Sequence, residues 1–121
     1  MENFRRHNFK KLKIWMMGMN LAKDVFDIVR TFPDSERYGL TAQMNRCTIS
    51  IPSNIAEGSS RTDKAFRHFL DIALGSSFEL QTQILLANFK GHLSVELTRE
   101  FENKIEQLQR ATMEFQKGLS S

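Results

Sequence analysis

The stretch SIPSNIAEG at positions 50–58 places Pro52 between apolar residues that keep the spacing of a helix. Proline has no N–H to donate to the carbonyl of Thr48, and its ring crowds that carbonyl, so a straight helix through Pro52 loses about 3 kcal/mol. Ser50, Ser53 and Asn54 can hydrogen-bond the backbone groups that are left unpaired. We therefore expect a helix with a kink at Pro52 and not a loop.

Apolar residues at helical spacing extend this pattern over four segments, at about 12–32, 40–58, 60–90 and 94–115. Proline or glycine ends the first three, at Pro33, Gly58 and Gly91, and Ser94 can cap the last. The predicted inner faces are Leu12, Trp15, Met19, Ala22, Phe26 and Val29; then Leu40, Met44, Cys47, Ile51 and Ile55; then Phe66, Leu70, Ala73, Ser77, Leu80, Ile84 and Ala87; and finally Leu97, Phe101, Ile105, Leu108, Thr112 and Phe115.

No alternating β-branched run is flanked by hairpin turns, so the fold class is all-α. Short connections make neighbouring helices antiparallel, which predicts an up-down-up-down four-helix bundle with a proline-kinked second helix. Its 121 residues form one domain, residues 1–121. In the third segment, Ser60 and Asp63 have the form of a capping box that would start the helix, and Gly75-Ser76-Ser77 removes side-chain bulk where another helix could approach closely.

A second apolar band runs along the first and third segments and is wider than one seam of a bundle requires. It consists of Ile14, Met16, Leu21, Ile28, Phe69, Ile72, Phe78 and Leu86. Packing this band against copies of the same chain in a closed cyclic oligomer is the simplest way to cover it. The alternative is a broad core with scattered exposed apolar residues, which are normal on protein surfaces.

The net charge is +3 with a pI near 9.2, and the basic character is concentrated at the N-terminus. The first 13 residues carry five basic side chains against Glu2 alone: Arg5, Arg6, Lys10, Lys11 and Lys13. Residues 1–10 form a basic arm that could neutralise RNA or DNA phosphates, or could be a solvated helix start. Further candidate contacts are Arg46, Arg61, Lys64 and Arg67.

Several classes of protein are disfavoured. The chain has neither an apolar run long enough to span a membrane nor a signal peptide, so we expect a cytoplasmic protein with no membrane partner. The three histidines form no metal-binding pattern, Cys47 lies among apolar neighbours as an inert thiol would, and no nucleophile has a placed base. We therefore expect no cofactor, no metal and no enzymatic activity.

Charged residues near the predicted inner faces need partners or water. We expect a structural polar network of Arg46, Asn54, Glu57 and Glu79. The alternative is a catalytic role, in which Glu57 and Glu79 form a general acid and base pair.

Three further segments carry a family resemblance together with positions 50–58. They are Phe9-x-x-Leu12-x-x-Trp15; Phe32-Pro33-x-x-Glu36-x-Tyr38-Gly39-Leu40-x-x-Gln43-x-x-Arg46; and Ile72-Ala73-Leu74-Gly75-Ser76-x-x-Glu79-Leu80. Together they resemble the four-helix-bundle family of 23S rRNA-intervening-sequence proteins. The family commonly has two adjacent arginines and an alanine where this chain has Asn45-Arg46-Cys47, so one basic contact of that helix is absent here.

The resemblance implies a small bacterial bundle that assembles as a ring, typically a homopentamer, without enzymatic activity. A remoter similarity, to the accessory variability proteins of diversity-generating retroelements, implies binding of nucleic acid and of a reverse transcriptase. The first functional hypothesis is thus a homo-oligomeric adaptor whose basic arm contacts RNA or DNA phosphates without reading sequence. The alternative is a scaffold that binds a partner protein through the ring surface.

Overall fold

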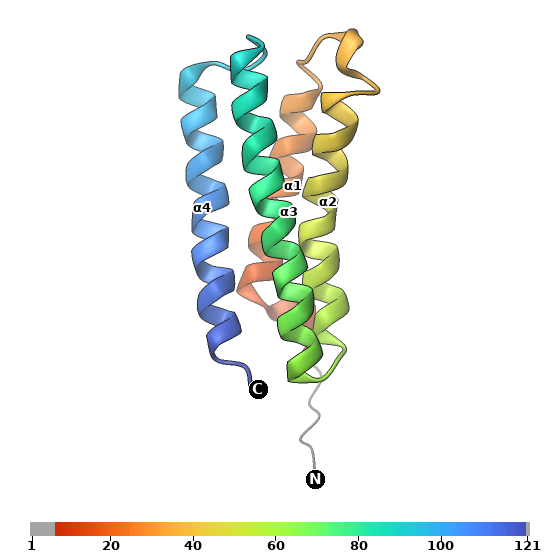
Figure 1. The fold of residues 1–121 in the computed structure, drawn as a ribbon, viewed down its shortest axis with the longest axis vertical. Coiled ribbons are helices and arrows are strands. Elements are labelled where there is room, and N and C mark those ends of the chain that lie inside the picture. Colours follow the sequence, from red (N-terminus) through yellow and green to blue (C-terminus); the bar gives the residue numbers. More distant parts are fainter. Residues whose placement is uncertain (1–6, 121) are drawn as a thin grey trace.

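The computed structural model describes residues 7–120, which form four α-helices joined by short connections (Figure 1). Helix α1 spans Lys13–Val29, α2 spans Leu40–Ser59, α3 spans Asp63–Phe89 and α4 spans Val95–Lys117. A single turn of 3-10 helix, Phe9–Lys11, precedes α1, and another, Asp34–Glu36, lies between α1 and α2. No strand occurs in residues 7–120, which confirms the all-α prediction.

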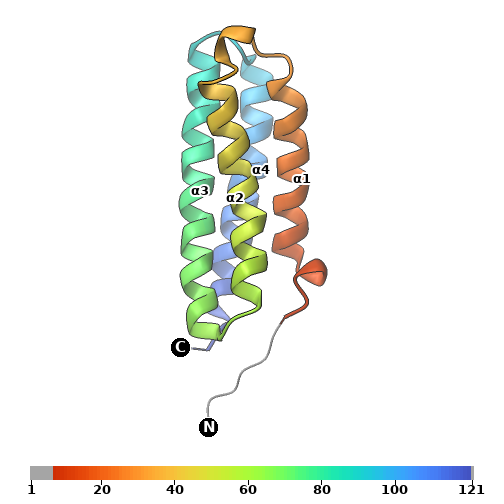
Figure 2. The same cartoon turned by 90° about the vertical axis from the view of Figure 1, so that its right-hand side faces the viewer.

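Successive helices run in opposite directions, and each packs against the next in sequence, with α4 closing the bundle against α1 (Figures 1 and 2). Each helix contributes fully buried side chains to one central core, among them Val25, Ile55, Leu80 and Ile105. The four-helix bundle predicted from apolar spacing is therefore the observed architecture.

The buried face of α1 differs from the predicted one. Its buried residues are Ile14, Gly18, Leu21, Ala22, Val25 and Val29. Trp15 and Met19 are only half-buried and Phe26 is exposed. Two apolar stripes on α1 both satisfy helical spacing, and the buried one includes Gly18, which adjoins Ile51 and Pro52 of α2.

Helix α2 continues through Pro52 without interruption. The Asn54 side chain donates to the backbone oxygen of Ser50 at 2.8 Å and to its hydroxyl at 2.9 Å. Neither bond reaches the carbonyl of Thr48, the group to which Pro52 has no N–H to donate, so the expected pairing of that carbonyl is not among these contacts. The kink itself stays a prediction.

The connection between α2 and α3 differs from the expected capping box. The Ser60 hydroxyl donates back to the oxygen of Glu57 at 2.8 Å, so it does not cap α3. Thr62 caps that helix by accepting from the N–H of Ala65 at 3.3 Å. Helix α2 also continues one residue past Gly58, which is buried.

Two other predicted helix boundaries, at Gly91 and Ser94, are confirmed, whereas α1 ends at Val29, before the predicted end at Phe32. Gly91 has φ of +83°, a conformation that favours glycine, just beyond the end of α3. Ser94 caps α4 by accepting from the N–H of Leu97 at 3.1 Å.

At the end of the bundle opposite the α2–α3 connection, a buried carboxylate joins the α1–α2 connection to the α3–α4 connection. Glu36 is only 6% exposed and accepts hydrogen bonds from Lys90 and, at 2.8 Å, from His92. Its pKa is lowered from 4.5 to about 2, first by the Lys90 ammonium and next by His92. The segment after α1 is thereby fastened to the segment after α3.

Within residues 7–120, no helix has both the length and the apolar character that crossing a membrane requires.

Candidate nucleic-acid interface

Most of the predicted basic contacts lie at one end of the bundle, where α1 and α3 begin and α2 ends (lower end in Figure 1). They come from two separate stretches of the chain, 10–13 and 61–67, and are Lys10, Lys11, Lys13, Arg61, Lys64 and Arg67. Arg5 and Arg6 precede this group in sequence and lie outside the described residues. We call the six described residues the basic end.

The lysines of the basic end are exposed. Within residues 7–120, no ion pair joins Lys11, Lys13 or Lys64 to an acidic side chain. The Lys10 ammonium lies 6.0 Å from the centre of the Phe9 ring. These ammonium groups can turn toward a phosphate without breaking an ion pair within that part of the chain.

The two arginines of the basic end already have partners. Arg61 forms an ion pair with Glu57 at 2.7 Å and lies over the Phe69 ring at 5.5 Å. Arg67 donates to the backbone oxygens of Gln116 at 2.9 Å and Leu119 at 3.3 Å, just where α4 ends. Arg67 therefore fastens the end of α4, and Glu57 offsets the charge of Arg61.

Arg46 does not belong to the basic end. It lies almost four turns before the end of α2, which corresponds to about 20 Å along the helix. It is exposed beside a polar pocket between α2 and α3.

The predicted polar network of Arg46, Asn54, Glu57 and Glu79 does not form among the described residues. Asn54 bonds to Ser50, Glu57 pairs with Arg61, and Glu79 accepts only a weak bond from the Cys47 thiol at 3.9 Å. The physical reason is that Arg46, Glu57 and Glu79 are exposed, so water can solvate their charges. Glu57 lies near the end of α2, beside the start of α3, whereas Glu79 lies roughly four turns along α3. The structure therefore does not bring the two carboxylates together as an acid and base pair.

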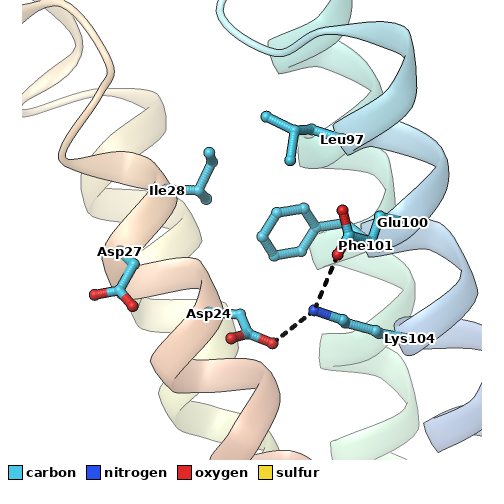
Figure 3. A pocket seen from close by; sticks show the side chains of 7 residues that line it. All are labelled: Asp24, Asp27, Ile28, Leu97, Glu100, Phe101 and Lys104. Atoms are coloured by element: carbon cyan, nitrogen blue, oxygen red, sulfur yellow. Dashed lines mark hydrogen bonds and ion pairs between the residues drawn. The ribbon is translucent and has the colours of Figure 1, made fainter.

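A pocket of about 230 Å³ between α1 and α4 has the opposite electrostatic character (Figure 3). Asp24, Asp27 and Glu100 line it, and the ammonium of Lys104 lies 2.9 Å from Asp24 and 3.8 Å from Glu100. Its excess of carboxylates disfavours phosphate. No group of three or more histidine, cysteine or acidic side chains in the described residues is arranged to hold a metal ion.

Two apolar surfaces remain uncovered. A groove of about 360 Å³ between α1 and α2, here called the α1/α2 groove, is lined by Trp15, Met19, Ala22, Lys23, Phe26, Ile49, Pro52, Ser53 and Ala56. On α3, Phe78, Leu85 and Phe89 are 50%, 47% and 86% exposed and share one line along the helix, here called the α3 ridge. Sequence reasoning missed Leu85 and Phe89, although their spacing from Phe78 could have revealed the line.

The predicted second apolar band is only partly exposed. Ile14 and Leu21 belong to the core, whereas Met16, Ile72, Phe78 and Leu86 are exposed. On α1, the apolar side chains that line the α1/α2 groove are instead Trp15, Met19 and Phe26, which were predicted to face the core.

The family model for 23S rRNA-intervening sequence proteins matches residues 10–114, which include all four helices except the last residues of α4. The comparison with curated proteins gave no match.

Proposed function

This chain belongs to the 23S rRNA-intervening sequence protein family, and from that membership we propose that it is a non-enzymatic, homo-oligomeric adaptor that binds RNA or DNA through its basic end. The observation that carries the proposal is the set of exposed lysines at the basic end, which lie in the 3-10 turn before α1 and at the starts of α1 and α3. Arg5 and Arg6 add charge just before them in sequence. Such a group neutralises phosphates without reading bases.

The two apolar surfaces support self-association. The α1/α2 groove and the α3 ridge come from different helices of the bundle, so the ridge of one copy can pack into the groove of the next. A contact between two different surfaces builds a ring when its rotation closes. A ring, a homopentamer in the form typical of the family, repeats the basic end in every subunit and multiplies its attraction for a polyanion.

A partner protein is the alternative occupant of the same apolar surfaces. Under that alternative the chain is an interaction scaffold, and its positive charge serves partner choice. A complex that survives nuclease treatment would favour the scaffold over the nucleic-acid adaptor.

The test is the salt dependence of binding to a labelled single-stranded RNA, measured by fluorescence anisotropy with the full chain. A double variant, Lys11→Gln with Lys64→Gln, removes two charges from the basic end. We expect the slope of log K against log salt to fall by about 0.7 for each lysine that contacts a phosphate.

The matched control is Arg30→Gln with Arg99→Gln, which removes the same charge from exposed positions away from the basic end. This control should keep the wild-type slope. Equal slopes for the wild type and both double variants would show that the basic end does not contact the nucleic acid.

A further inference from the structure

The polar pocket between α2 and α3 has no part in the contacts proposed above. It has a volume of about 200 Å³ and is lined by Gln43, Arg46, Cys47, Ser50, Ser76, Glu79 and Gln83. Most of these residues belong to the segments that carry the family resemblance. Since the core and the basic end use other side chains, the polar character of this pocket needs its own explanation.

Some of its polar groups already bond to one another. The hydroxyls of Ser50 and Ser76 lie 2.9 Å apart, and the Gln83 amide donates to the sulfur of Cys47 at 3.4 Å. Burial raises the pKa of the Cys47 thiol, so the sulfur stays protonated and neutral at pH 7. Glu79 is thus the anion of this pocket.

Three groups are left without strong partners among residues 7–120. The Glu79 carboxylate accepts only the weak bond from the Cys47 thiol, at 3.9 Å. The Gln83 side chain is only 8% exposed, and its carbonyl oxygen accepts no hydrogen bond. The Arg46 guanidinium has no ion pair. The pocket therefore offers hydrogen-bond acceptors beside a cationic donor.

We propose that this pocket binds a guanine base of the nucleic acid, an inference that rests on the proposed function. The Watson–Crick edge of guanine carries two adjacent donors, N1–H and the N2 amino group, next to the acceptor O6. Glu79 accepts from both donors, and Arg46 donates to O6 or N7, the acceptors that arginine commonly contacts on guanine. Adenine turns a ring acceptor toward the carboxylate, and uracil offers one donor only.

The same arrangement disfavours a cationic side chain from a partner protein. An incoming arginine could pair with Glu79, but its charge would then face Arg46 across a small pocket. A neutral base meets both groups without that repulsion. The α3 ridge does not cover the pocket either, because Glu79 is rotated about 100° around the helix from Phe78.

The test uses the full chain and labelled oligonucleotides of about ten nucleotides, a length that a single-strand site can hold. All carry uracil except at one central position, which is guanine, adenine or hypoxanthine. We expect guanine to bind about tenfold more tightly than adenine, in line with the discrimination of one bidentate contact. Hypoxanthine lacks the amino group and should fall between them.

The variant Glu79→Gln keeps the shape of the side chain and replaces an acceptor with a donor. It should abolish the guanine preference while keeping the salt-dependent binding. Glu96→Gln, at an exposed position in the first turn of α4, is the matched control and should keep the preference.

Salt-dependent binding without any base preference, or a preference that survives Glu79→Gln, would overturn the guanine site alone. No binding of any oligonucleotide would overturn both the site and the proposed function. An arginine-containing peptide that binds the wild type but not Glu79→Gln, without a guanine preference, would assign the pocket to a protein partner and overturn the guanine site.

Discussion

Replacing Gly58 with alanine tests the packing of α2 on α3. A Cβ at Gly58 would lie 2.7 Å from Cδ1 of Phe66 and 2.7 Å from Cβ of Phe69. Phe66 is fully buried, so its ring cannot move aside freely. Overpacking of this kind costs about 1–3 kcal/mol, and the better helix propensity of alanine returns up to about 1 kcal/mol. We expect a net loss of about 1–2 kcal/mol in the free energy of unfolding.

The matched control is Gly75→Ala in the middle of α3. Gly75 is exposed, and an added Cβ would meet no atom within 4 Å among the described residues, apart from its chain neighbours and the backbone of its own helix. The same substitution should therefore stabilise the chain by about 0.5–1 kcal/mol. Urea unfolding followed by helical circular dichroism, at one fixed protein concentration, gives both values. A Gly58→Ala variant that is as stable as the Gly75→Ala variant would refute the observed packing of α2 on α3.

Two further predictions concern charge and assembly. Glu36 has a lower pKa in the folded chain, so the unfolded chain takes up its proton first, and stability that is present above pH 4.5 is lost as the pH falls toward about 2. Glu36→Gln should lose less stability than the wild type over that range in thermal melts, and identical losses would contradict the role of the carboxylate. Ile49→Glu places a charge in the α1/α2 groove, where Ile49 is 48% exposed, so the fold should persist while the oligomer mass falls toward 14.1 kDa. Met113→Glu, at a position on α4 that is 38% exposed, is its control in light scattering, and equal masses for the two variants would remove the groove from the interface.

The sequence predicted the longest helix best. Every residue of the expected inner face of α3, from Phe66 to Ala87, is buried. One continuous apolar stripe there keeps helical spacing as far as Ala87, with Gly91 beyond the end, although the predicted cap by Ser60 was wrong. On α1, two stripes satisfy the same spacing, and the choice between them depends on how α1 packs against the other helices, which spacing alone does not determine.

The candidate site was predictable only in part. The basic residues themselves are visible in the sequence, but antiparallel packing is what brings Lys11 and Lys64 to one end and leaves Arg46 apart from them. Glu36 was not expected to be buried, because its partners Lys90 and His92 are distant in sequence. The polar pocket likewise needs α2 and α3 in register before Gln83 can approach Cys47.

Light scattering combined with absorbance at two wavelengths, applied to the full chain mixed with a short RNA, measures the protein mass and the RNA mass of one species together. We expect at low salt a particle that holds several 14.1 kDa chains and bound RNA, and at high salt the same protein mass without RNA. A single 14.1 kDa chain free of RNA at low salt would contradict the account.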